Sequence, residues 1–91
     1  MKNEDLTTYR VLLSREAKAV LEADFDAVTR QQVLTKLDDQ LSVLPSRFAR
    51  RPVKHFDNRY YRVLVTGTYA WAFVIKAHEV WIVYGNLLAL M

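Results

Sequence analysis

Near residue 60 the hydrophobic pattern of this chain changes period, and that change limits the folds open to it. Before residue 60, apolar residues recur at spacings of three and four, as on one face of a helix: Val33, Leu34, Leu37, Leu41 and Leu44. From Tyr60 onward the pattern has a period of two, as in strands. Helices followed by strands in a chain of 91 residues predict an α+β fold, in one domain over residues 1–91.

The N-terminal part of the chain predicts a strand that leads into a helix. Residues 9–13 are a short apolar run, typical of a strand. Ser14 is a good helix N-cap, and Glu16 has the negative charge that a first turn favours. We therefore expect a first helix over residues 15–24, with a break at residues 24–26.

A second helix follows from the leucine spacing. Its N-terminus is capped either by Thr29 together with Gln32, as a capping box, or by Asp26. The pattern places Leu44 on the apolar face, and Pro45 ends the helix because the residue before a proline avoids the helical region. The two helices together predict a hairpin.

The rest of the chain predicts three strands in a meander. The predicted boundaries are strands at 60–66, 69–75 and 80–84, turns at 66–68 and 76–79, and a break at 85–86 before the tail 87–91. Gly67 can adopt the positive φ that the first turn needs. The tail is too apolar for a free end, so we expect it to pack on the sheet, on a second copy or on a partner.

The middle strand separates large residues from small ones. One face carries Tyr69, Trp71, Phe73 and Ile75, and the other carries Ala70, Ala72 and Val74. This division predicts helices on one side of the sheet only, with the aromatic row in the core rather than in a ligand cage. The predicted order is β-α-α-β-β-β. The N-terminal strand and the helical hairpin are expected to pack on one face of a small, mainly antiparallel sheet.

Positive charge is concentrated in one short stretch. The net charge of +3 comes from 13 Lys and Arg against 10 Asp and Glu. Residues 46–62, here called the basic connector, contain one acidic residue, Asp57, and six basic ones: Arg47, Arg50, Arg51, Lys54, Arg59 and Arg62. Such clustering beside aromatic residues suits nucleic acid, the ribosome or an acidic protein, whereas the alternative is a solvated loop. Arg47 lies close enough to the second helix to cap its end.

Several functional classes are excluded by residue types that are missing or rare. The chain has no cysteine and only two histidines, so disulfide scaffolds, thiolate zinc sites and histidine-rich metal centres are excluded. No glycine-rich phosphate loop is present. We expect no cofactor and no metal. The polar N-terminus and the absence of a run of about 20 apolar residues predict a cytoplasmic protein without membrane contact.

Taken together, these segments resemble the RelE/ParE superfamily of bacterial toxins from type II toxin–antitoxin systems. The motifs that carry the resemblance are residues 9–17 (Tyr-Arg-Val-Leu-Leu-Ser-Arg-Glu-Ala), the leucine helix ending in Leu44-Pro45, residues 53–56 (Val-Lys-His-Phe), residues 60–65 (Tyr-Tyr-Arg-Val-Leu-Val), and Tyr69 after a short turn. No single motif is diagnostic, and the resemblance rests on their joint order over about residues 9–85.

The resemblance implies a compact toxin and a cognate antitoxin that neutralises it. It also implies two different activities, because fold does not determine function. RelE-like toxins enter the ribosome and cleave messenger RNA, whereas ParE-like toxins bind and block DNA gyrase.

The positions at which RelE-like toxins place their catalytic residues are mostly apolar here. RNA cleavage by 2′-hydroxyl attack needs a base, an acid and cations that stabilise the crowded phosphate. The family supplies an Arg directly after the hairpin Tyr, but Ala70 follows Tyr69 in this chain. Residues 85–91 contain no Arg, Lys, His or Tyr, and the matching strand offers only Arg62.

A substitute catalytic set is conceivable. Histidine is a common general base in enzymes, so His55 is the candidate base, and Lys54, Arg59 and Arg62 can hold phosphate. A surface histidine in a basic loop is the simpler interpretation of His55, and His78 is expected to face solvent in a turn.

Three functions therefore stay open, and the residues favour the first. It is a toxin that poisons an essential target, with gyrase favoured, through Arg50, Arg51, Lys54, Arg59, Tyr61 and Arg62. The second is a metal-independent, ribosome-dependent endoribonuclease that acts through the substitute set. The third is a non-toxic family member that serves as an antitoxin-binding or regulatory partner. Whether the chain forms a homodimer is left open.

Overall fold

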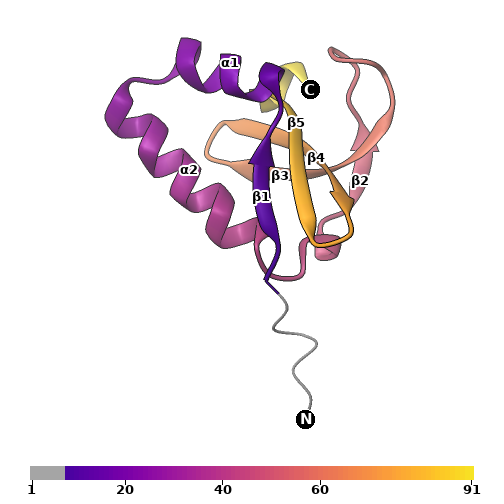
Figure 1. The fold of residues 1–91 in the computed structure, drawn as a ribbon. Coiled ribbons are helices and arrows are strands. Elements are labelled where there is room, and N and C mark those ends of the chain that lie inside the picture. Colours follow the sequence, from indigo (N-terminus) through magenta and orange to yellow (C-terminus); the bar gives the residue numbers. More distant parts are fainter. Residues whose placement is uncertain (1–7) are drawn as a thin grey trace.

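The structure is a computed structural model that describes residues 8–91, and it has an α+β fold with two helices and one five-stranded mixed sheet (Figure 1). The elements in chain order are β1 (Arg10–Leu13), α1 (Arg15–Asp24), α2 (Ala27–Leu41), the 3-10 turn η2 (Pro45–Arg47), β2 (Arg50–Pro52), β3 (Tyr60–Thr66), β4 (Tyr69–Lys76), β5 (Glu79–Leu87) and the 3-10 turn η3 (Leu88–Leu90). The predicted fold class is confirmed, and so are the bounds of α1 and β3.

The strands lie in the order β1-β5-β4-β3-β2. β1 pairs in parallel with β5, and the three other pairings are antiparallel, which confirms a mainly antiparallel sheet. One part of the prediction is wrong. β1 does not pack on the face of the sheet with the helices, because it forms the edge strand beside β5. A second difference is β2, a short strand inside the basic connector, where no strand was predicted.

Both helices begin at side-chain caps. The Ser14 hydroxyl accepts a hydrogen bond from the amide of Ala17 at 3.1 Å and donates one to the carbonyl of Val83 at 2.9 Å, which ties α1 to β5. Asp26 caps α2 by accepting from the amide of Thr29 at 2.7 Å. Of the two caps predicted for α2, the structure therefore selects Asp26. The hydrogen bond from the Thr29 amide holds the pKa of Asp26 below its usual value.

The end of α2 differs from the prediction. The helix ends at Leu41, and Leu44 is 48% exposed with a left-handed φ of 50°. The cause lies in the residues just before β1, Thr8 and Tyr9. The Ser42 carbonyl accepts from the amide of Tyr9 at 2.8 Å, and Val43 forms a bridge with Thr8. Residues 42 and 43 therefore pair with the segment that leads into β1 instead of continuing the helix.

The core has two parts, one on each face of the sheet. On the helix side, the buried side chains of α1 and α2 pack against β3, β4 and β5: Ala17, Leu21, Leu37, Leu41, Leu64, Trp71, Phe73, Val80 and Ile82. On the opposite face a smaller cluster joins Val53, Val63, Ala70, Ala72 and Met91. The predicted division of β4 into a large and a small face is confirmed, although a bulge lies between Ala72 and Phe73.

The predicted break at residues 85–86 is wrong, because β5 runs through it to Leu87. Gly85 pairs with Trp71 across the ladder, and a Cβ added there would lie 2.3 Å from the Trp71 ring. The glycine therefore makes room for an indole rather than ending a strand. Gly67 does adopt a positive φ of 61°, as predicted for the turn between β3 and β4.

The apolar tail packs on the sheet, which was one of the three expected locations. Met91 is buried in the second cluster, and its carbonyl accepts from the amide of Lys54 at 3.0 Å. Three leucines of the tail stay partly exposed: Leu87, Leu88 and Leu90. In residues 8–91, no helix combines the length and the apolar content needed to cross a membrane.

Candidate target-binding surface

Part of the basic connector is a strand of the sheet. Its strand β2 pairs antiparallel with the start of β3, at the edge of the sheet farthest from β1. The register partners are Arg50 with Arg62, Arg51 with Tyr61, and Pro52 with Tyr60. Sequence reasoning missed this strand, because Pro52 and two adjacent arginines are poor strand signals.

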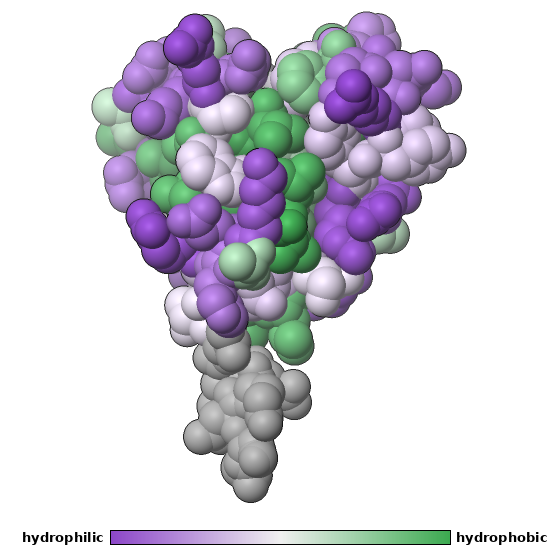
Figure 2. All heavy atoms as spheres, turned by 45° about the vertical axis from the view of Figure 1, so that its right-hand side comes forward, coloured by the Kyte–Doolittle hydropathy of each residue, from purple (hydrophilic) through white to green (hydrophobic). Residues whose placement is uncertain are grey.

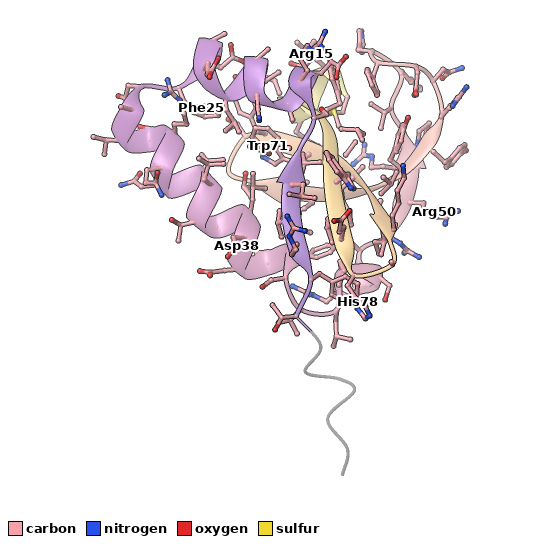
Figure 3. All side chains as sticks on the ribbon, viewed as in Figure 1. Arg15, Phe25, Asp38, Arg50, Trp71 and His78 are labelled. Atoms are coloured by element: carbon pink, nitrogen blue, oxygen red, sulfur yellow. The ribbon has the colours of Figure 1, made fainter. Side chains whose placement is uncertain are left out.

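The ladder places the predicted site residues on both faces of the sheet. Arg62 is the register partner of Phe73, which packs under the helices, so Arg62 and its neighbour Arg50 face the helix side. Arg51 and Tyr61 face the other side, where Tyr61 packs against the second cluster. Figure 3 shows Arg50 at the opposite end of the sheet from α1 and α2.

On the helix side, the connector borders a depression of about 260 Å³. Its lining consists of Arg50, Tyr60, Tyr61, Arg62, Phe73, Val74 and Ile75. Arg62 is fixed in place, because its Nη1 donates to the carbonyls of Ser46 at 2.9 Å and Phe48 at 2.8 Å. It therefore ties β3 to the segment after α2, in addition to any role in binding.

On the other side, residues 54–57 form a turn that carries Lys54 and His55, both exposed. The Phe56 ring stacks on Tyr84 of β5, with centroids 4.7 Å apart and planes within 5°. The turn is therefore anchored on the sheet through an aromatic contact.

Asp57 closes the same turn. Its carboxylate accepts from the amide of Arg59 at 3.0 Å and from the Tyr61 hydroxyl. Desolvation acts to raise the pKa of Asp57, but these hydrogen bonds and the charge of Arg59 outweigh it and lower the pKa. The bond to Asp57 in turn raises the pKa of Tyr61. Asp57, the acidic residue of the connector, thus stabilises this turn.

Among the described residues, no connector cation forms an ion pair with a carboxylate. The ion pair that residues 8–91 do contain joins Arg10 to Glu79 at 3.3 Å, near the edge of the sheet opposite the connector. Four connector cations are exposed and make no side-chain hydrogen bond to another described residue: Arg50, Arg51, Lys54 and Arg59. Figure 2 shows hydrophilic side chains on both flanks of the molecule, separated by an apolar band over its middle.

Arg47 has the capping role predicted for it. Its guanidinium donates to the carbonyl of Leu44 at 3.1 Å and to the side-chain oxygen of Gln40 at 3.0 Å. It also lies over the ring of Phe48, 4.3 Å from the centroid. Although exposed, it is hydrogen-bonded at the end of α2 and does not belong to the set of four cations whose side chains make no such bond.

The substitute catalytic set is only partly assembled. Lys54 and His55 share a turn with Arg59 close behind, but Arg62 faces the helix side and is bonded to two carbonyls. His78 is exposed in the turn between β4 and β5, as predicted (Figure 3). Among residues 8–91, no three His, Cys, Asp or Glu side chains are grouped as a metal site would require.

Comparison with protein families, with curated proteins and with solved structures finds no significant match to this chain. Its function is therefore argued from its own residues.

Proposed function

We propose that this protein is a growth-inhibiting toxin of the RelE/ParE type, which binds an essential target through its basic connector and is neutralised by an antitoxin. DNA gyrase is the leading candidate for the target. One observation carries the proposal: Arg50, Arg51, Lys54 and Arg59 are exposed on a scaffold fixed by β2 and the anchored turn, and within residues 8–91 none of them forms an ion pair with a carboxylate. Positive charge fixed in this way suits an acidic partner surface.

Binding is favoured over RNA cleavage for a geometric reason. Cleavage needs a base, an acid and cations around one phosphate. His55 is on the turn of one face, whereas Arg62 faces the other side of the sheet, so the two do not meet around one phosphate. The alternative of a ribosome-dependent nuclease rests on Lys54, His55 and Arg59 alone, which lie within one short segment. A non-toxic, antitoxin-binding role is the third candidate.

Controlled expression in a bacterial host tests the proposal. We expect growth arrest in which DNA synthesis stops first and a DNA-damage response follows, and we expect the purified protein to inhibit supercoiling by gyrase. Early loss of protein synthesis with cleaved messages would establish the nuclease instead. Unimpaired growth at a verified expression level would contradict both toxin mechanisms.

A matched pair of variants links the effect to the connector. In one, Arg50, Arg51, Lys54 and Arg59 are all changed to Gln. In the control, four exposed cations outside the connector are changed to Gln: Arg15, Lys18, Lys36 and Lys76. Both lose four positive charges, and exposed charges contribute little to stability. We expect the first variant alone to lose toxicity and antitoxin affinity while keeping its melting temperature. Equal behaviour of the two variants would show that the connector has no special role.

A further inference from the structure

Two arginines lie directly opposite each other at the edge of the sheet. Arg50 of β2 and Arg62 of β3 are register partners in an antiparallel ladder, so their side chains leave the same face. Like charges at opposed positions destabilise a sheet. Within residues 8–91 neither is paired with a carboxylate. The sheet thus tolerates an unfavourable pair at this position.

The two guanidinium groups are held differently. Arg62 is positioned by the carbonyls of Ser46 and Phe48, and both of these hydrogen bonds use Nη1. Arg50 is exposed and makes no hydrogen bond to another described side chain or carbonyl. A fixed guanidinium group (Arg62) and an exposed one (Arg50) therefore share a single surface. The planar guanidinium group of arginine can donate two parallel hydrogen bonds to the oxygens of a phosphate.

An exposed aromatic ring completes the arrangement. Tyr60 lies two residues before Arg62 on β3, on the same face, and its exposed fraction is 67%. Its ring belongs to neither core cluster, whereas the ring of its neighbour Tyr61 packs against the second cluster. An exposed ring beside cations is the arrangement on which nucleic-acid bases stack.

The depression between these residues is small. Its volume of about 260 Å³ is below the range of about 300–1,000 Å³ usual for pockets that hold drug-sized ligands. Phe73, Val74 and Ile75 contribute apolar or backbone surface to its lining, and within residues 8–91 no carboxylate lines it.

We propose that Arg50, Arg62 and Tyr60 form a binding site for one nucleotide unit of a single-stranded nucleic acid. The phosphate lies between the two guanidinium groups, and the base stacks on the Tyr60 ring. A phosphate without a base would use the arginines but not Tyr60, and a peptide of acidic residues has no aromatic ring to stack on it. The site does not depend on the proposed function, because it requires neither toxicity nor gyrase.

The test is fluorescence anisotropy of the purified full chain with labelled oligothymidylate and oligouridylate of about eight nucleotides, a length within the range of single-strand sites. We expect Tyr60→Ala to weaken binding about fivefold or more, and Tyr60→Phe to retain it, because stacking needs the ring and not the hydroxyl. Arg50→Gln should weaken binding and lower the slope of log affinity against log salt by about 0.7, the contribution of one phosphate contact.

Lys18→Gln is the matched control, since it removes one exposed charge on α1, away from the depression. Equal affinities for the Arg50→Gln and Lys18→Gln variants would overturn the site, and so would full binding by Tyr60→Ala. Competition by inorganic phosphate or by a polyglutamate peptide as strong as that of the unlabelled oligonucleotide would reduce it to a general anion surface and also overturn it. A preference between thymidylate and uridylate would identify DNA or RNA as the source of the nucleotide. Because the assay measures no growth effect, its failure leaves the proposed toxicity standing.

Discussion

The two faces of β4 are covered in different ways. On one face Trp71 and Phe73 are fully buried beneath two helices, and on the other Ala70 and Ala72 are buried beneath Val53 and the chain end at Met91. Large side chains reach up to a helix layer, whereas alanines allow a turn and a tail to lie close against the strand. The helix side therefore carries most of the apolar burial. The other side supports segments that display charge, and we expect the two faces to respond differently to substitution.

The largest effect is expected on the helix side. Trp71→Ala should lower the free energy of unfolding by about 3–5 kcal/mol and Leu37→Ala by about 2–5 kcal/mol, because both side chains are almost completely buried. For a domain of this size, such losses approach the whole stability. Denaturant unfolding followed by tryptophan fluorescence or circular dichroism measures them. Unchanged midpoints for both variants would show that the helix face is not the principal core.

Gly85→Ala sharpens the comparison by adding one methyl group to the same face. The new Cβ would meet the Trp71 ring at 2.3 Å, so the buried indole has to move, and we expect a loss of about 1–3 kcal/mol. Gly67→Ala is the control, because the Cβ there has no neighbour within 4 Å and only the φ of 61° is unfavourable. Its loss should be about 1 kcal/mol, and Gly67→Asn should be milder because Asn tolerates the left-handed region. A Gly85→Ala variant as stable as the parent would mean that the indole can be displaced without penalty.

On the opposite face the expected effect is smaller. Met91→Ala should destabilise by about 1 kcal/mol, since Met91 lies outside the strands and its segment relaxes around a missing side chain more easily than a strand does. Deletion of residues 88–91 should in addition uncover Val53 and Ala70 and promote aggregation. Thermal unfolding and size-exclusion chromatography report the two effects. If Met91→Ala lowers the free energy of unfolding as much as Trp71→Ala, the helix side does not contribute more to stability than the opposite face.

The smallest effect concerns a single contact between α1 and β4. The Tyr69 hydroxyl donates to the carboxylate of Asp24 at 2.7 Å, and this bond raises the pKa of Tyr69 from 10.0 to about 12. The pKa of the folded state is the higher one, so the contribution is complete below pH 10 and is lost as the pH rises towards 12. Tyr69→Phe should lower stability by about 0.5 kcal/mol at neutral pH.

The pH dependence gives this prediction its specific test. The difference in stability between the parent and the Tyr69→Phe variant should shrink between pH 10 and pH 12, as the tyrosine of the parent ionises. A difference that stays constant across this range would show that the hydrogen bond to Asp24 does not stabilise the fold.

Elements whose signals are local were predicted well. The bounds of α1 follow from the cap at Ser14, and the two faces of β4 follow from strict alternation. The errors occur where a distant residue takes part. Leu44 leaves the predicted helix because residues 42 and 43 pair with residues 8 and 9, just before β1. β5 continues through Gly85, where the Trp71 ring lies over the glycine.

Prediction of the candidate site from sequence is limited in the same way, by contacts between distant residues. The density of basic residues in the connector is visible in the sequence, and so is the exposure expected for most of them. The sequence does not show that Arg50 and Arg62 are neighbours, that Arg62 is bonded to two carbonyls, or that Tyr60 is exposed while Tyr61 packs. Each of these facts depends on the register between β2 and β3, and a shift by one residue would exchange the faces.

The sequence by itself thus determined the fold class, the positions of most helices and strands and the side of β4 that enters the main core, because periodicity and capping act over a few residues. Tertiary structure alone decided that β1 pairs with β5, about 70 residues away, and that the connector adds a strand to the opposite edge of the sheet. Strand pairing is a choice among distant partners, and packing over the whole domain selects among them. The surface proposed here to bind a target and a nucleotide is a product of that choice.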